Sequence, residues 1–173
     1  AEEQKALAAL PELAEQALTD TTARDLAARY RFATRLVTTG RGYAYPTARE
    51  AALKIMETSY LPALAFSGAD LLHGPVAMVD QDMPVLAFVS SGAGGAAMHE
   101  VLTRLGERRA DVLVVGPSEV TGVAAGIRVP QVDERYAPLL DILPVQQLAL
   151  VLALARGENP DAPRGLTKVT STF

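Results

Sequence analysis

Two predicted strands, residues 84–89 and 111–116, constrain the fold of this chain more than any other feature, because both are apolar throughout except for Asp111 at the start of the second. Each is typical of a strand buried on both faces, because a strand with one wet face alternates apolar and polar residues. A helical segment, 98–107, lies between them. The other predicted strands are 33–39 and 127–130, and the other predicted helices of the domain are 46–59, 67–72 and 137–156. This alternation predicts an α/β fold, a three-layer α/β/α doubly wound parallel sheet.

The composition excludes several classes of function. The 173 residues suit one domain, and aromatic residues are only 5% with no Trp, so Ala, Leu and Val must form the core. A net charge of −4 without a basic stripe argues against a nucleic-acid partner. Without cysteine and with only His73 and His99, no metal site is expected. No apolar run approaches about 18 residues and no signal peptide is visible, so we expect no membrane partner and a cytoplasmic location.

The chain divides into three parts. Residues 1–31 are predicted to form a helical lead-in, or a linker from an upstream domain, in which Pro11 breaks or kinks the first helix. Residues 32–158 form the main domain. Its last helix contains Pro144, where the regular part is expected to begin. Residues 159–173 form a tail. Because the chain starts at Ala1 rather than Met, we expect it to be a fragment.

Two glycine loops, 40–42 and 90–95, each follow a predicted strand and precede a helix. In doubly wound sheets, ligands sit beyond the carboxyl ends of the strands, where the strand order reverses. The second loop, with Ser90 and Ser91, is able to hold an anion at a helix N-terminus, but a merely flexible connection fits the pattern equally well.

Glu50, Lys54 and Glu57 form a charged triad at spacing i, i+4, i+7, so they share one face of a helix. The ordinary interpretation is a solvated ladder of ion pairs, each contributing roughly 0.3–0.5 kcal/mol. The alternative is chemical. Moving hydrogen between adjacent sugar carbons needs a carboxylate to carry the proton and a cation near the oxygen that gains charge.

Two further residues have both an ordinary and a chemical interpretation. His73, before a Gly-Pro pair, either closes a short helix or serves as an acid/base for opening a sugar ring. Lys168, in the polar tail, is either a surface lysine or a group that reaches a carbonyl to form a Schiff base. His99 is interpreted as a surface residue, because no other candidate side chain converges on it.

Five motifs in this order resemble the sugar isomerase (SIS) domain family, and within it the second SIS domain of glucosamine-6-phosphate synthases and their deaminase-like relatives. The similarity covers nearly the whole chain, and its motifs are 40–42, 50–60, 72–75, 82–85 and 163–168. It implies a flavodoxin-like sheet, a hexose 6-phosphate substrate, and either a homodimer or pairing with a first SIS domain. The ending and residues 66–69 look more like the deaminase-type relatives.

The resemblance also implies roles for individual residues. It assigns the proton transfer between C1 and C2 to Glu57, support of the enediolate to Lys54, and a supporting position to Glu50. It gives ring opening in a neighbouring subunit's site to His73, and the Schiff base to Lys168 on a tail that covers the sugar. The residues expected to contact substrate are Gly40, Arg41, Gly42, Ser90, Ser91 and Thr167. No cofactor is implied, because enolisation by these groups needs none.

One departure from the family pattern limits this expectation. The family holds the phosphate with a Ser-x-Ser-Gly-x-Thr loop in the first SIS domain, and this chain lacks that loop. The sequence therefore predicts half of an enzyme that interconverts fructose 6-phosphate and glucosamine 6-phosphate. A regulatory module that only binds sugar phosphate is the main alternative, and a purely structural half is another.

Overall fold

The computed structural model describes residues 2–165 of the chain. Within them, five parallel strands form one sheet in the order β2-β1-β3-β4-β5. The strands are β1 (Leu36–Gly40), β2 (Ala63–Ser67), β3 (Pro84–Phe88), β4 (Asp111–Gly116) and β5 (Ala125–Arg128). The order is that of a flavodoxin-like doubly wound sheet, which confirms the predicted fold class.

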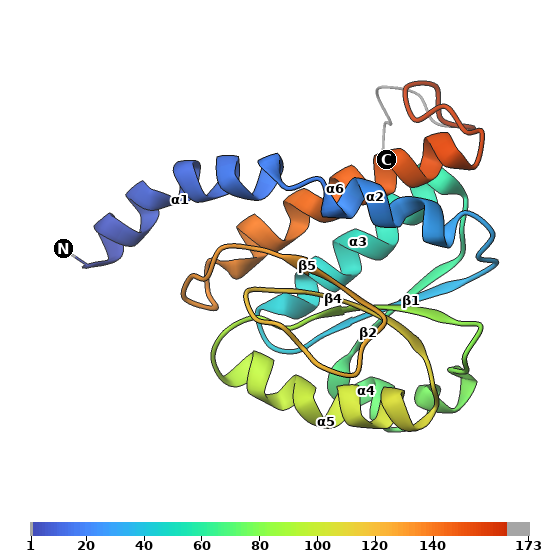
Figure 1. The fold of residues 1–173 in the computed structure, drawn as a ribbon, viewed down its shortest axis with the longest axis horizontal. Coiled ribbons are helices and arrows are strands. Elements are labelled where there is room, and N and C mark those ends of the chain that lie inside the picture. The colour runs from blue at the N-terminus through green and yellow to red at the C-terminus, as the bar shows by residue number, and fades with distance from the viewer. Residues whose placement is uncertain (1, 166–173) are drawn as a thin grey trace, which may run out of the picture.

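Helices cover both faces of the sheet, and Figure 1 shows them as separate layers. One layer contains α2 (Thr22–Ala27), α3 (Ala44–Ser59) and α6 (Ala137–Ala155), and α3 packs along α6. The other contains α4 (Gly68–Leu72) and α5 (Ala93–Glu107). Helix α1 (Glu2–Thr19) contacts α6 and projects from the body of the domain (Figure 1). Two 3₁₀ turns, η1 (Ala28–Tyr30) and η2 (Pro75–Met78), complete the described elements.

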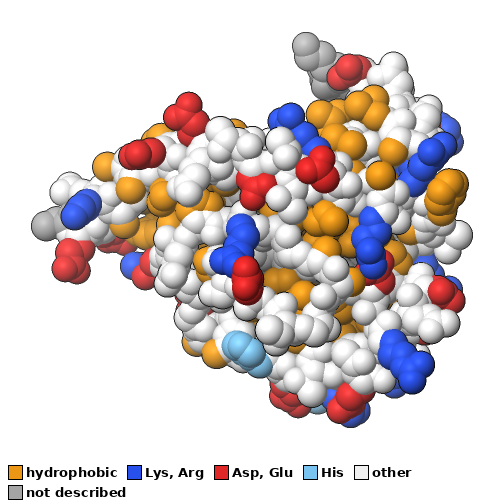
Figure 2. All heavy atoms as spheres, viewed as in Figure 1, with side chains coloured by type: hydrophobic (Ala, Val, Ile, Leu, Met, Phe, Trp, Pro, Cys, Tyr) orange, Lys and Arg blue, Asp and Glu red, His pale blue; other side chains and the backbone are white. Residues whose placement is uncertain are grey.

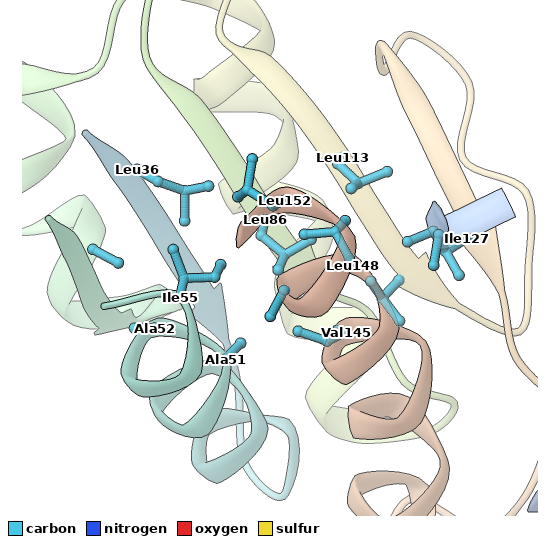
Figure 3. Close-up of a cluster of buried hydrophobic side chains, with 14 of the residues drawn as sticks. Leu36, Ala51, Ala52, Ile55, Leu86, Leu113, Ile127, Val145, Leu148 and Leu152 are labelled. Carbon is cyan, nitrogen blue, oxygen red and sulfur yellow. The ribbon is translucent and has the colours of Figure 1, made fainter. Parts of the chain in front are cut away.

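The core is split by the sheet into two apolar clusters. Figure 3 shows the first, where β-strand side chains such as Leu86 and Leu113 meet Ile55 of α3 and Leu148 of α6. The second lies between the opposite face of the sheet and α5. Because both faces are covered, β1 and β3 are buried at every position, as continuous apolar strands require.

The sequence-based boundaries were wrong in several places. Strand β2 was missed, because it is a five-residue edge strand with Leu64 exposed and gives no long apolar run. Helix α1 continues through Pro11 without the predicted break. Helix α6 begins at Ala137, as predicted, but it is helical from there and not only from Pro144. Helices α3 and α5 begin earlier than predicted, at Ala44 and Ala93. Much of the second glycine loop is therefore helix.

Helix α6 is the one described helix that is long and apolar enough, by length and composition alone, to cross a membrane. More than half of its most apolar window is buried inside the domain. A core helix of this kind is apolar because it packs on several neighbours, here α1, α2 and α3.

One buried acid interrupts this core. Asp141 of α6 is 1% exposed, and its Oδ2 atom has no hydrogen-bond partner among residues 2–165. Burial raises the pKa of this carboxyl to about 7, because the charged form loses its hydration. In the unfolded chain the pKa is about 3.9. The folded state therefore binds more protons between roughly pH 4 and pH 7, and stability falls as the pH rises through that window.

We expect Asp141→Asn to remove this loss of stability. The free energy of unfolding of the variant should exceed that of the wild type by about 2–4 kcal/mol at pH 8, and by only about 1 kcal/mol at pH 4.5. Denaturant unfolding of both proteins at the two pH values measures the difference. An advantage for asparagine that does not depend on pH would contradict the assignment to Asp141.

Candidate functional site

The two glycine loops meet where the strand order reverses, between β1 and β3. A Cβ on Gly94 would lie 2.8 Å from the carbonyl oxygen of Arg41, and one on Gly42 would lie 3.8 Å from Gly94 Cα. Gly42 also has φ +56°, a conformation that favours glycine. The absence of side chains thus lets the two backbones touch. This is the position at which open α/β sheets bind ligands.

An open pocket of about 820 Å³ lies beside these loops. It is lined by Tyr43, Ser91, Gly92 and residues 131–135 of the segment that leads into α6. Ser91 is thus available to a ligand, whereas Ser90 is buried and its hydroxyl has no hydrogen-bond partner in the described part of the chain. The Glu134 carboxylate accepts a hydrogen bond from the Gly94 backbone N–H at 2.9 Å. Sequence reasoning did not single out Glu134.

A second pocket, of about 750 Å³, opens between α4 and α5. Arg41 and His73 both line it, together with Arg104. His73 is exposed at the C-terminal end of α4, where its backbone N–H donates to the Ala69 and Asp70 carbonyls. The ordinary role as a helix-closing residue is therefore present, and the side chain faces a cationic pocket as well. His99 is exposed on α5, with Nδ1 2.9 Å from the Ala96 carbonyl oxygen.

The charged triad lies on an accessible side of α3. Lys54 Nζ is 2.7 Å from Glu57 Oε2 and 3.6 Å from Glu50 Oε1. The side chains of Lys54 and Glu57 are 34% and 37% exposed, so the pair is open to a ligand as well as to water. The hydrogen bond that Lys54 donates to Glu57, with the charges of both carboxylates, raises the pKa of Lys54 and keeps it cationic.

The triad and the glycine loops form two separate groups in this chain. Helix α3 rises about 1.5 Å per residue, so Glu57 lies about 20 Å along the helix axis from Ala44, which follows the first loop. The structure thus brings Glu50, Lys54 and Glu57 together, and brings Gly40, Arg41 and Gly42 next to the loop that carries Ser90 and Ser91. It does not join the two groups.

The segment that leads to the tail docks at the far end of α3. The Arg164 backbone N–H donates to the Tyr60 hydroxyl at 2.7 Å, and the Arg164 guanidinium lies 4.4 Å from the centre of the Tyr60 ring. Tyr60 follows Glu57 by three residues, so the beginning of the tail contacts the chain just after the triad. Thr167 and Lys168 lie outside the described residues. Among residues 2–165, no group of three or more His, Asp or Glu side chains is arranged to hold a metal ion.

Two curated relatives are similar to nearly the whole chain. A glutamine–fructose-6-phosphate aminotransferase (isomerizing) of Pyrobaculum aerophilum is 37% identical over 99% of this chain and 29% of its own length. The same enzyme of Thermotoga maritima is 36% identical over 94% of this chain and 28% of its own length. The chain therefore spans less than a third of these relatives.

Solved structures show the same fold. The C-terminal domain of glucosamine-fructose-6-phosphate aminotransferase from Francisella tularensis superimposes with a TM-score of 0.85 at 25% identity, over 91% of this chain and 46% of that one. Tagatose-6-phosphate ketose/aldose isomerase from Escherichia coli gives a TM-score of 0.75 at 25% identity, over 93% and 46% of the two chains. A protein-family model described as "SIS domain" matches residues 30–156. The chain belongs to the SIS domain family.

Proposed function

We propose that this chain is the second SIS domain of an enzyme that interconverts fructose 6-phosphate and glucosamine 6-phosphate. The observation that carries the proposal is the half-buried Lys54–Glu57 pair, 2.7 Å apart on α3, with the Arg164 segment docked on Tyr60 at the end of the same helix. The similarity to glutamine–fructose-6-phosphate aminotransferases over almost all of the chain supports the same substrate class. Whether ammonia is added or removed at C2 is left to experiment.

In this mechanism Glu57 is the group that moves the proton. Its carboxylate takes the proton from C1 of the open-chain ketose form and returns it to C2, and the reverse reaction uses the same base. In the same isomerisation the C1 hydroxyl loses its proton to become the aldehyde oxygen, and the oxygen or nitrogen at C2 gains a proton. Electron density moves to the oxygen or nitrogen at C2 as the C1–H bond breaks. Lys54 stays positively charged beside Glu57 and stabilises the charge that develops there. Glu50, 3.6 Å from Lys54 Nζ, helps to orient the ammonium.

The remaining candidates take supporting roles. His73, exposed at the end of α4, would open the sugar ring in the site of a neighbouring subunit. Lys168 would form a Schiff base with the keto sugar. It lies four positions after Arg164 in the sequence, a span of at most about 14 Å, so the triad end of α3 is within its reach. Thr167, in the same segment, would contact the sugar at the triad. Gly40, Arg41, Gly42 and Ser91, with Ser90 beneath them, belong to the separate glycine-loop group and would contact only a sugar phosphate bound at that group.

The exposed apolar side chains around the triad support a pairing surface. Leu53 and Met56 of α3 are 42% and 40% exposed, and Leu64 of the neighbouring edge strand is 51% exposed. A first SIS domain or a second copy of this chain would cover them and bring its own substrate cradle to the triad. We propose a cytoplasmic enzyme that works in this paired form.

The first test is an activity measurement on the full protein that contains this chain. Ammonia release from glucosamine 6-phosphate without glutamine would establish the deaminase direction. Formation of glucosamine 6-phosphate from fructose 6-phosphate only when glutamine is present would establish the aminotransferase. Binding of fructose 6-phosphate without either reaction would overturn the proposal and indicate a regulatory module.

A further inference from the structure

The N-terminus of α5 already holds an anion that belongs to the chain itself. This helix has 15 residues, and the open pocket beside the glycine loops is lined by Gly92, which precedes its first turn, and by Glu134. The Gly94 N–H donates to Glu134 Oε2 at 2.9 Å, across 40 residues of sequence. A helix N-terminus carries partial positive charge, so a carboxylate in this position is favoured in the same way as a phosphate oxygen.

The loop is shaped around this carboxylate. Gly92 has φ +91°, and a Cβ there would lie 2.9 Å from both Cδ and Oε2 of Glu134. A Cβ on Gly94 would lie 3.2 Å from the same oxygen. Glycine at both positions therefore gives the Glu134 side chain its room. The buried hydroxyl of Ser90, without a hydrogen-bond partner among residues 2–165, is a further polar group in the loop.

We propose that Glu134 is an internal anion that closes the α5 N-terminus to phosphate. With the carboxylate in place, a phosphate group would meet a negative charge and an N–H that is already engaged. The substrate phosphate must then be bound by groups outside this loop, while Ser91 at its rim stays free for a sugar hydroxyl. The proposal concerns anion binding by this chain alone, and it holds whether or not the chain takes part in catalysis.

The test is a titration of the 173-residue chain with inorganic phosphate, followed by the amide ¹⁵N and ¹H shifts of Gly94. We expect Glu134→Ala to give a saturable shift with a dissociation constant at least about tenfold lower than that of the wild type, because the occupant is gone. Glu134→Gln keeps the size of the side chain and an acceptor oxygen but no charge, so its affinity should fall between the two. Glu12→Ala, which removes the same charge from an exposed site on α1, should behave as the wild type.

The phosphate titration distinguishes a role of Glu134 in excluding phosphate from no such role. A graded gain of phosphate binding from wild type to glutamine to alanine, confined to residues of the loop, supports the proposal. If the Gly94 amide of the wild type titrates as strongly as that of the variants, Glu134 does not exclude phosphate. The same conclusion follows if a folded Glu134→Gln protein shows no gain. Because the glutamine variant is nearly isosteric, it keeps the test available should the alanine variant fail to fold.

Discussion

Glu57→Gln is expected to lower the turnover of the full protein by at least about 100-fold and by as much as about 10,000-fold, the usual contribution of a general base. The amide keeps the shape and polarity of the side chain but cannot accept the proton from C1. Binding of the sugar phosphate should change little, because the proposed phosphate contacts lie outside the triad. The measurement is kcat and KM for the isomerisation, with sugar-phosphate affinity measured separately.

The chain offers a close control for this variant. Glu107 of α5 is paired with Arg104 at 2.7 Å and at spacing i, i+3, the same geometry as Lys54–Glu57. Both pairs are accessible to water, Arg104–Glu107 more than Lys54–Glu57, and such pairs contribute at most about 1 kcal/mol to stability. Glu107→Gln should therefore keep full activity, and neither variant should unfold. Near-normal turnover of Glu57→Gln, or an equal loss in both variants, would contradict the role of Glu57.

Gly95→Ala is expected to lower the free energy of unfolding by at least about 4 kcal/mol, a loss that few single substitutions cause. A Cβ at this buried position would overlap the carbonyl oxygen of Ser90, which is backbone and cannot turn away. Either the first turn of α5 or the end of the loop must move, and both are packed against β3 and its neighbours. Chemical denaturation or a thermal melt of the variant measures the loss.

Gly106→Ala in the same helix is the matched control. A Cβ there meets nothing within 4 Å, so only the intrinsic helix preference changes. Alanine is favoured over glycine inside a helix by roughly 0.5–1 kcal/mol, so this variant should be slightly more stable than the wild type. A Gly95→Ala protein as stable as the wild type would mean that the loop relaxes at little cost.

The parts of the fold that were predicted from the sequence are those with a strong local signal. The runs that became β3 and β4 are buried on both faces, so apolar residues fill them without interruption. Strand β2 carries no such signal, because its place at the sheet edge leaves Leu64 in water. The start of α5 was hidden for another reason. Glycines usually indicate a loop, whereas Gly95 lies inside the helix because the backbone of Ser90 leaves no room for a side chain.

In the candidate site, too, the features with a local sequence signal were predicted, and the contacts between distant segments were not. The triad was found from its spacing, since three residues on one helix are neighbours whatever the rest of the chain does. The contact of Glu134 with Gly94 joins segments 40 residues apart, and no local pattern indicates it. The separation of the triad from the glycine loops also needed the structure, because only the strand order shows which end of α3 lies at the switch point.

The contact between Arg164 and Tyr60 has a consequence for the local concentration of a group carried by the tail. This contact holds the Arg164 backbone and guanidinium beside Tyr60 at the end of α3, and under the proposed function it would set the concentration of the Lys168 amine near the triad. A short tether of this kind gives a millimolar or higher effective concentration that does not change when the protein is diluted. A short loop that starts at Arg164 also costs less entropy to close than a longer loop that starts at the end of α6. Under the proposed function, the stacking of Arg164 on Tyr60 thus raises the equilibrium occupancy of the triad by the segment that follows.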